Sequence, residues 1–106
     1  MGSLMRRRDD MTRITEILIR AKTGIMPTHL MSDTRLRYGP CFELVEKLLK
    51  LGFLELVPIS DTRVKYQRVK YHTTEKGSIF IERVLMCYSM IGDNYLEELI
   101  KKVRAV

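Results

Sequence analysis

Apolar and polar positions in the middle of the chain recur with a helical period. At about 100° per residue the apolar side chains fall on one arc, and they are Cys41, Phe42, Leu44, Val45, Leu48, Leu49 and Leu51. The polar side chains fall opposite, and they are Glu43, Glu46, Lys47 and Lys50. Pro40 is tolerated in a first helical turn, and Gly52 can adopt the left-handed conformation that ends a helix. We therefore predict a three-turn amphipathic helix with one buried face and one exposed face.

Two helical segments precede this amphipathic helix. The first runs from residue 10 or 11 to about residue 22, where apolar residues recur at helical spacing, namely Ile14, Ile17, Leu18 and Ala21. The second is short, at about residues 28–32, with Pro27 or Thr28 at its start. We expect Leu30 and Met31 to face the core. Residues 33–37 then form the turn before the amphipathic helix.

After Gly52 the pattern becomes that of extended chain. The apolar run 53–57 predicts a strand closed by Pro58, and residues 60–62 have turn chemistry. From residue 63 to 71 apolar and basic residues alternate, which predicts a second strand with one packed face and one cationic face. The cationic residues are Arg63, Lys65, Arg68 and Lys70. The alternative interpretation is an edge strand that its charges protect from aggregation.

The C-terminal third is helical and strongly apolar. Thr73 or Thr74 can cap a helix whose residues 78–91 carry apolar side chains around nearly the whole circumference. Gly92-Asp93-Asn94 interrupts it, and a last helix with a single apolar stripe follows. A domain of this size can cover one side of the first helix with its own core, so the other side is a candidate subunit interface. The alternative is a monomer whose tail folds back on itself.

Length and charge narrow the class of protein. The chain has 106 residues, enough for one domain, and a formal net charge of +6. Residues 13–37 and residues 58–77 each carry a net +3, on either side of the amphipathic helix. This placement favours a polyanionic partner, although basic composition also serves solubility. No apolar run approaches the roughly 18 residues of a membrane span, and residues 1–8 lack the apolar region of a signal peptide. We expect a cytoplasmic protein with no membrane partner.

Residues that carry chemistry in enzymes are few. Cys41 and Cys87 have no metal-ligand spacing, and we expect both to be reduced thiols in the core. His29 and His72 are far apart in sequence, and no phosphate-binding loop or hydrolase motif is present. We therefore expect no enzymatic activity, no metal and no cofactor.

The order helix, helix, turn, helix, strand, basic hairpin, helix resembles the archaeal winged helix-turn-helix DNA-binding proteins. These include small transcriptional regulators and chromatin proteins that dimerise through a C-terminal helix. The resemblance covers about residues 11–91 and is carried by Thr28-x-Leu30-Met31, Leu36-x-Tyr38, Val45-x-x-Leu48-x-x-Leu51-x-Phe53-Leu54 and Tyr71-x-Thr73-Thr74-x-Lys76-Gly77. Two features depart from the family pattern: the wing at residues 57–69 is longer than in the small members, and Gly92 breaks a helix that is continuous in the coiled-coil dimers.

The resemblance implies an α+β winged helix-turn-helix, made of three helices and a β-hairpin wing, with C-terminal dimerisation helices. Residues 1–10 would be a flexible N-terminus, residues 11–77 the DNA-binding domain and residues 78–106 the dimerisation segment. In this fold the third helix enters the major groove with its N-terminal part, and the wing follows an adjacent groove or the backbone. The implied DNA contacts are Arg35, Arg37, Tyr38, Lys47, Arg63, Lys65 and Arg68. The expected dimer interface comprises Phe80, Val84, Cys87, Tyr88, Ile91, Tyr95 and Leu99.

Glu43 and Glu46 lie on the same exposed face as the implied DNA contacts. They either accept hydrogen bonds from cytosine or indicate that the helix touches DNA with its first turn alone. Taken together, these patterns predict a homodimer that binds double-stranded DNA, as a transcriptional regulator or a small architectural protein. The alternative is a winged helix used as a protein-interaction module in a larger assembly, because the fold does not determine the function.

Overall fold

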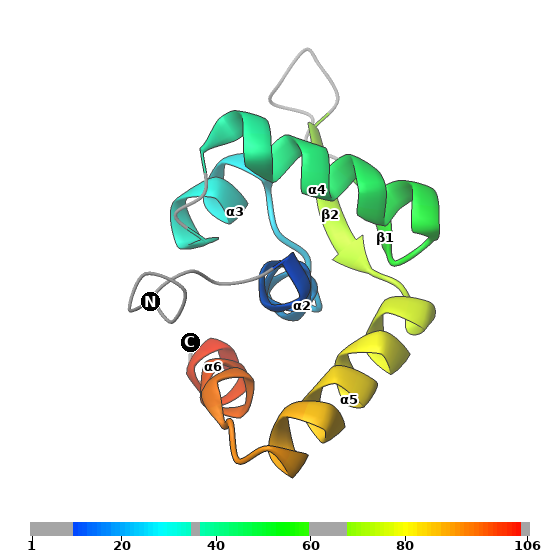
Figure 1. The fold of residues 1–106 in the computed structure, drawn as a ribbon. Coiled ribbons are helices and arrows are strands. Elements are labelled where there is room, and N and C mark those ends of the chain that lie inside the picture. Colours follow the sequence, from blue (N-terminus) through cyan, green and yellow to red (C-terminus); the bar gives the residue numbers. More distant parts are fainter. Residues whose placement is uncertain (1–9, 35–36, 60–67, 105–106) are drawn as a thin grey trace.

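The computed structural model of the chain describes residues 10–34, 37–59 and 68–104, so the expected flexible N-terminus falls almost wholly outside the described residues. The elements in chain order are α2 (Asp10–Arg20), α3 (Pro27–Thr34), α4 (Tyr38–Leu51), β1 (Leu54–Ile59), β2 (Arg68–Thr73), α5 (Glu75–Met90) and α6 (Tyr95–Arg104). The strands form an antiparallel hairpin, with Leu54 opposite Thr73 and Ile59 opposite Arg68. This confirms the predicted α+β winged-helix architecture with C-terminal helices (Figure 1).

The hairpin differs from the prediction in two details. β1 continues through Pro58 to Ile59, whereas Pro58 was expected to close the strand. A proline is tolerated there because β1 pairs, among the described strands, with β2 alone and so has an open edge that needs no N–H donor. In addition, Ile25 exchanges two backbone hydrogen bonds with Tyr71, at 2.9 and 2.8 Å, on the other edge of β2. The linker between α2 and α3 therefore acts as a third, one-residue strand.

α2 is the centre of the fold. It packs against α3, α4, α5, α6 and β2, and Figure 1 shows it end-on with α3 and α4 on one side and α5 and α6 on the other. The sequence predicts one apolar stripe on this helix, yet five consecutive residues are buried, from Thr15 to Ile19. Such a run requires neighbours all round the helix, and only the arrangement of the other elements supplies them.

The buried polar residues of α2 have partners. Thr15 Oγ1 donates to the Met11 carbonyl at 2.8 Å within the helix. Glu16 is buried and lies 3.7 Å from Arg20 Nε, and a second nitrogen of Arg20 lies 3.7 Å from Asp33 on α3. Arg20 therefore links the central helix to α3 while it neutralises a buried carboxylate, which would otherwise be costly to bury.

The C-terminal helices fold back onto the same chain. α5 begins after Thr74, whose Oγ1 accepts a hydrogen bond from the Gly77 amide at 3.1 Å, which decides between the two predicted caps. The chain turns at Gly92, where φ is 76°, and α6 then places Leu96 and Leu99 in the core beside α2. The face of α5 that points away from α2 stays exposed, with Met86 and Met90 on it. None of the described helices has the length and apolar character needed to cross a membrane.

Candidate nucleic-acid interface

α4 lies on the outside of the domain, and its N-terminal end is open. Arg37 precedes it in extended conformation and makes no side-chain capping bond to the first turn. The Cys41 amide donates to the Arg37 carbonyl at 3.0 Å, and Pro40 has no N–H to satisfy. The positive end of the α4 dipole therefore has no capping side chain from Arg37, and exposed Arg37 and Gly39 stand on either side of Tyr38 there.

The buried face of α4 is narrower than the sequence predicts. Cys41, Val45 and Leu48 are buried, as expected. Phe42 and Leu51 were predicted in the core but are each 43% exposed. They stand at the two edges of the predicted apolar arc, and the elements packed against α4 cover only the middle of that arc.

The opposite face of α4 carries four exposed charged residues, Glu43, Glu46, Lys47 and Lys50. Each glutamate stands four residues before a lysine, the spacing at which helical ion pairs form. Among the described residues, however, neither glutamate lies within ion-pair distance of a cation. The two carboxylates and two ammonium groups are therefore all presented to solvent.

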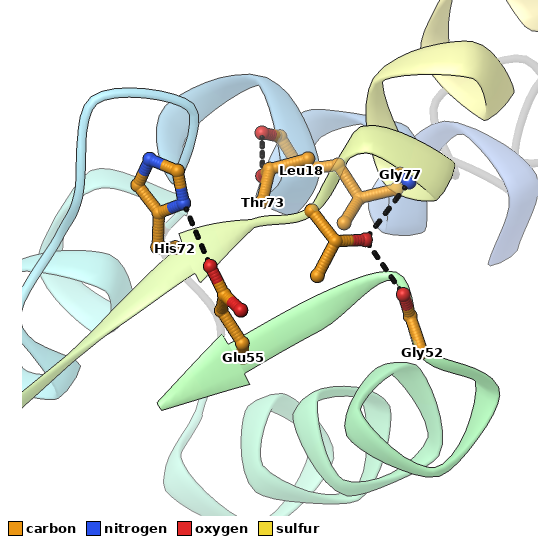
Figure 2. Close-up of polar contacts among 7 residues, drawn as sticks. Leu18, Gly52, Glu55, His72, Thr73 and Gly77 are labelled. Carbon is orange, nitrogen blue, oxygen red and sulfur yellow. Dashed lines mark hydrogen bonds and ion pairs between the residues drawn. The ribbon is translucent and has the colours of Figure 1, made fainter. Parts of the chain in front are cut away.

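The C-terminal end of α4 is fixed to α5 (Figure 2). Gly52 ends the helix with φ at 80°. Thr74 Oγ1 donates to the Gly52 carbonyl at 2.6 Å, and the Gly77 amide donates to the same hydroxyl. Lys76 Nζ donates to the Leu51 carbonyl at 2.8 Å. Carbonyls that a helix end leaves without partners are thus bonded by the start of α5. The C-terminal end of α4 is therefore tied to α5, whereas its N-terminal end has no side-chain cap.

The hairpin of β1 and β2, which carries the wing, is packed at its base and exposed further out. Leu54, Tyr71 and Thr73 are buried, and Thr73 Oγ1 donates to the Leu18 carbonyl of α2 at 2.6 Å. Leu56 and Val69, on the same face of the hairpin, are exposed. On the other face His72 Nδ1 lies 3.4 Å from the Glu55 carboxylate across the two strands (Figure 2). The base of the wing therefore belongs to the core, and only its outer part can reach a partner.

The structure describes only some of the predicted DNA contacts. Arg37 is exposed before α4, and Lys47 is exposed on its outer face. Tyr38 is the first residue of α4 and Arg68 the first of β2, but both side chains lie outside the described residues, as do Arg35, Arg63 and Lys65.

Lys50 was not among the predicted DNA contacts, but it is exposed on the same face of α4 as Lys47. The sequence signal for it was its position in the polar arc of the helix. Lys70 instead lies against the α2–α3 turn, where a Cβ added to Gly24 would stand 3.0 Å from its Cδ.

The expected dimer residues divide between the buried and the exposed sides of the C-terminal helices. Val84 and Leu99 are buried in the core of the single chain, and Phe80 and Tyr88 are half-buried. The Tyr88 hydroxyl lies 2.7 Å from Thr12 Oγ1 on α2, which places this side of α5 inward. Cys87, Ile91 and Tyr95 are exposed. They are accompanied by three exposed residues that were not predicted at the interface, Ile79, Met86 and Met90.

The two cysteines differ in environment. Cys41 is buried against the core, and burial raises the pKa of its thiol because the thiolate is poorly solvated there. Cys87 was expected in the core but is exposed on α5, so that expectation is wrong. Its position in a run of apolar residues indicated burial, but no described element packs against that side of α5.

No known family model matches the chain, and no curated protein matches it. Solved structures do match. A PadR-like transcription factor from Bacteroides fragilis superposes with a TM-score of 0.63 at 19% identity, over 86% of this chain and 90% of that one. Sso10a-2, a DNA-binding protein from Sulfolobus solfataricus, superposes with a TM-score of 0.62 at 20% identity, over 92% of this chain and 95% of that one. These identities show a shared fold.

A third similar structure was solved with nucleic acid. It is a mutant of MarR from E. coli complexed with operator DNA, with a TM-score of 0.57 and 24% identity, over 84% of this chain and 61% of that one. The winged-helix fold of DNA-binding proteins is therefore confirmed. The similar structures come from bacterial regulators as well as from an archaeal protein, so the likeness is wider than the archaeal group that the sequence resembles.

Proposed function

We propose that this protein binds double-stranded DNA in the cytoplasm, as a small transcriptional regulator or architectural protein, and that it does so without catalysing a reaction. The observation that carries the proposal is the setting of α4. Its C-terminal end is bonded to α5, whereas its N-terminal end has no side-chain cap and follows exposed Arg37 with exposed Gly39 and Pro40. A fold shared with transcription regulators and with a regulator bound to operator DNA supports the same conclusion.

In this proposal the N-terminal half of α4 enters the major groove and the wing follows the backbone. Lys47 contacts DNA from α4, Tyr38 from its first residue, and Arg35 and Arg37 from the segment just before it. Arg63, Lys65 and Arg68 bind phosphates from the wing. The phosphate contacts supply most of the affinity through release of counterions, so binding weakens as salt rises.

Arg37→Ala combined with Arg63→Ala is expected to weaken binding to mixed-sequence duplex by at least about tenfold and to lower the salt slope by about two, roughly one for each phosphate contact. Fluorescence anisotropy across a salt series measures both quantities. The matched control is Lys101→Ala combined with Lys102→Ala, which removes the same charge from the exposed face of α6. Equal affinities for the two double variants would refute this face as the DNA interface. If the unaltered protein binds no duplex even at low salt, the protein-interaction module becomes the better proposal.

We also propose that the protein is a homodimer. Its interface lies on the outer face of α5, rather than on the residues expected from the sequence. Ile79, Arg83, Met86 and Met90 follow a spacing of four, three and four residues, which is a heptad seam. Met86 and Met90 are 67% and 82% exposed, which is unusual for adjacent apolar residues on one stripe. The seam is self-complementary in an antiparallel pair, since Ile79 of one copy would oppose Met90 of the other and Arg83 would oppose Met86. The exposed residues Cys87 and Ile91 would flank it.

Met86→Lys is expected to convert the dimer to a monomer, because it replaces an apolar contact of the seam with a positive charge opposite the positively charged Arg83 of the other copy. Light scattering at matched concentrations measures the mass. Glu97→Gln is the control, since it makes the same change of net charge on α6 outside the seam. A dimer mass retained by Met86→Lys would rule out this interface, and a monomer mass for the unaltered protein would rule out the dimer itself.

A further inference from the structure

The face of α4 that is available to DNA carries carboxylates, which a phosphate-binding surface would normally exclude. Glu43 lies opposite the buried stripe formed by Cys41, Val45 and Leu48, so it points directly away from the core. It stands one turn after exposed Gly39 and Pro40, neither of which has a side chain that can donate or accept a hydrogen bond. Glu43 is therefore the first exposed side chain that the structure describes after Arg37 that can exchange a hydrogen bond with a base.

A carboxylate in the major groove is repelled by the phosphates unless a donor compensates it. The protein does not supply that donor within the described residues, since Lys47 is exposed on the next turn and yet not within ion-pair distance of Glu43. A base edge that presents an amino group can supply that compensation. The Glu43 carboxylate and the Lys47 ammonium group can therefore both turn toward DNA.

Two bases present an amino donor in the major groove, cytosine through N4 and adenine through N6. The adenine amino group lies between two acceptors, its own N7 and O4 of the paired thymine, and both repel a carboxylate. The cytosine amino group has an acceptor on one side only, O6 of the paired guanine. A glutamate therefore favours cytosine, and a lysine beside it finds O6 and N7 of guanine.

We propose that Glu43 and Lys47 together read a C·G base pair or two adjacent ones, Glu43 accepting from cytosine N4 and Lys47 donating to guanine. Their Cβ atoms are about 5–6 Å apart at this helical spacing, which suits neighbouring positions on the base-pair edge. The protein thus selects duplexes with a C·G pair where the exposed face of α4 meets the bases. This inference rests on the proposed DNA binding and adds the base that is recognised.

The test is selection from a random duplex library, carried out with the unaltered protein, with Glu43→Gln and with Glu97→Gln as the matched control on α6. Glutamine prefers adenine, because its amide both donates to N7 and accepts from N6. The unaltered protein and the control are expected to enrich one position as C·G, and Glu43→Gln is expected to change that position to A·T. Anisotropy on the two matched duplexes should show a reversal of preference of at least about fivefold. A merely structural role of Glu43 would not change the identity of a base.

The other outcomes separate the inference from the function on which it rests. If Glu43→Gln enriches the same base as the unaltered protein, Glu43 does not read DNA and the inference fails while DNA binding stands. If the protein binds duplex but enriches no sequence, the inference fails and an architectural role is favoured. Absence of binding to any duplex would refute the proposed function and the inference together.

Discussion

Replacing Gly77 with alanine is expected to destabilise the protein by about 3 kcal/mol, even though alanine is the better helix former. A Cβ at this position would stand 2.4 Å from the Phe53 carbonyl oxygen and 2.7 Å from Thr73 Cγ2. The Phe53 carbonyl cannot move aside easily, because it accepts a hydrogen bond from the Thr74 amide at 3.0 Å. The clash would separate the start of α5 from the end of α4, where Thr74 and Lys76 bond the last carbonyls.

Denaturant unfolding followed by circular dichroism measures this effect, and Gly39→Ala is its control. Gly39 is also helical, but a Cβ added there has no atom within 4 Å. Alanine at that position is expected to leave the free energy of unfolding unchanged or to raise it by up to about 1 kcal/mol. If the two variants were equally stable, close packing at Gly77 would not be the reason for a glycine there. Because Gly77→Ala disturbs the support of α4, it should also weaken DNA binding at temperatures where the variant is still folded.

Leu96→Ala is expected to lower the free energy of unfolding by about 3 kcal/mol, within the range measured for leucines in a packed core. Leu96 is fully buried where α6 returns to α2, so its loss would leave a cavity between these two helices. Lys101→Ala, on the exposed face of the same helix, should change stability by less than about 0.5 kcal/mol.

The Leu96 comparison also tests where α6 lies. If α6 were an undocked tail in solution, Leu96→Ala would cost no more than Lys101→Ala. Unfolding should be measured at one fixed protein concentration, because a dimer gains apparent stability as concentration rises. The light-scattering mass of Leu96→Ala should equal that of the unaltered protein, since Leu96 faces α2 and not the outer seam of α5.

The local pattern of apolar residues and helix-end residues was sufficient to predict most of the secondary structure. The 3.6-residue period marked α4, Gly52 marked its end, and the pair Thr73-Thr74 marked the start of α5. Those signals act within a few residues, through helix periodicity and through the hydrogen bonds that helix ends need. The resemblance of the ordered elements to winged helices then indicated the fold, which the structure confirms.

Burial could not be predicted in the same way, because it depends on what covers each face. Phe42 and Leu51 belong to an apolar arc by sequence but are exposed, since the neighbours of α4 cover only the centre of the arc. Glu16 lies outside the apolar stripe predicted for its helix, yet it is buried because other elements surround α2 and Arg20 lies 3.7 Å from its carboxylate. In both cases burial depends on which elements, distant in sequence, cover the helix.

The C-terminal helices show most clearly what the sequence determines and what the tertiary structure decides. The sequence alone determined that residues 78–91 carry apolar side chains all round and that a break at Gly92 separates them from a last amphipathic helix. Only the tertiary structure decided which side of α5 is inside: Val84 and Tyr88 face α2, and Met86 and Met90 are left outside. The physical reason is that periodicity records how side chains are distributed around one helix, whereas burial depends on the direction from which other helices approach it.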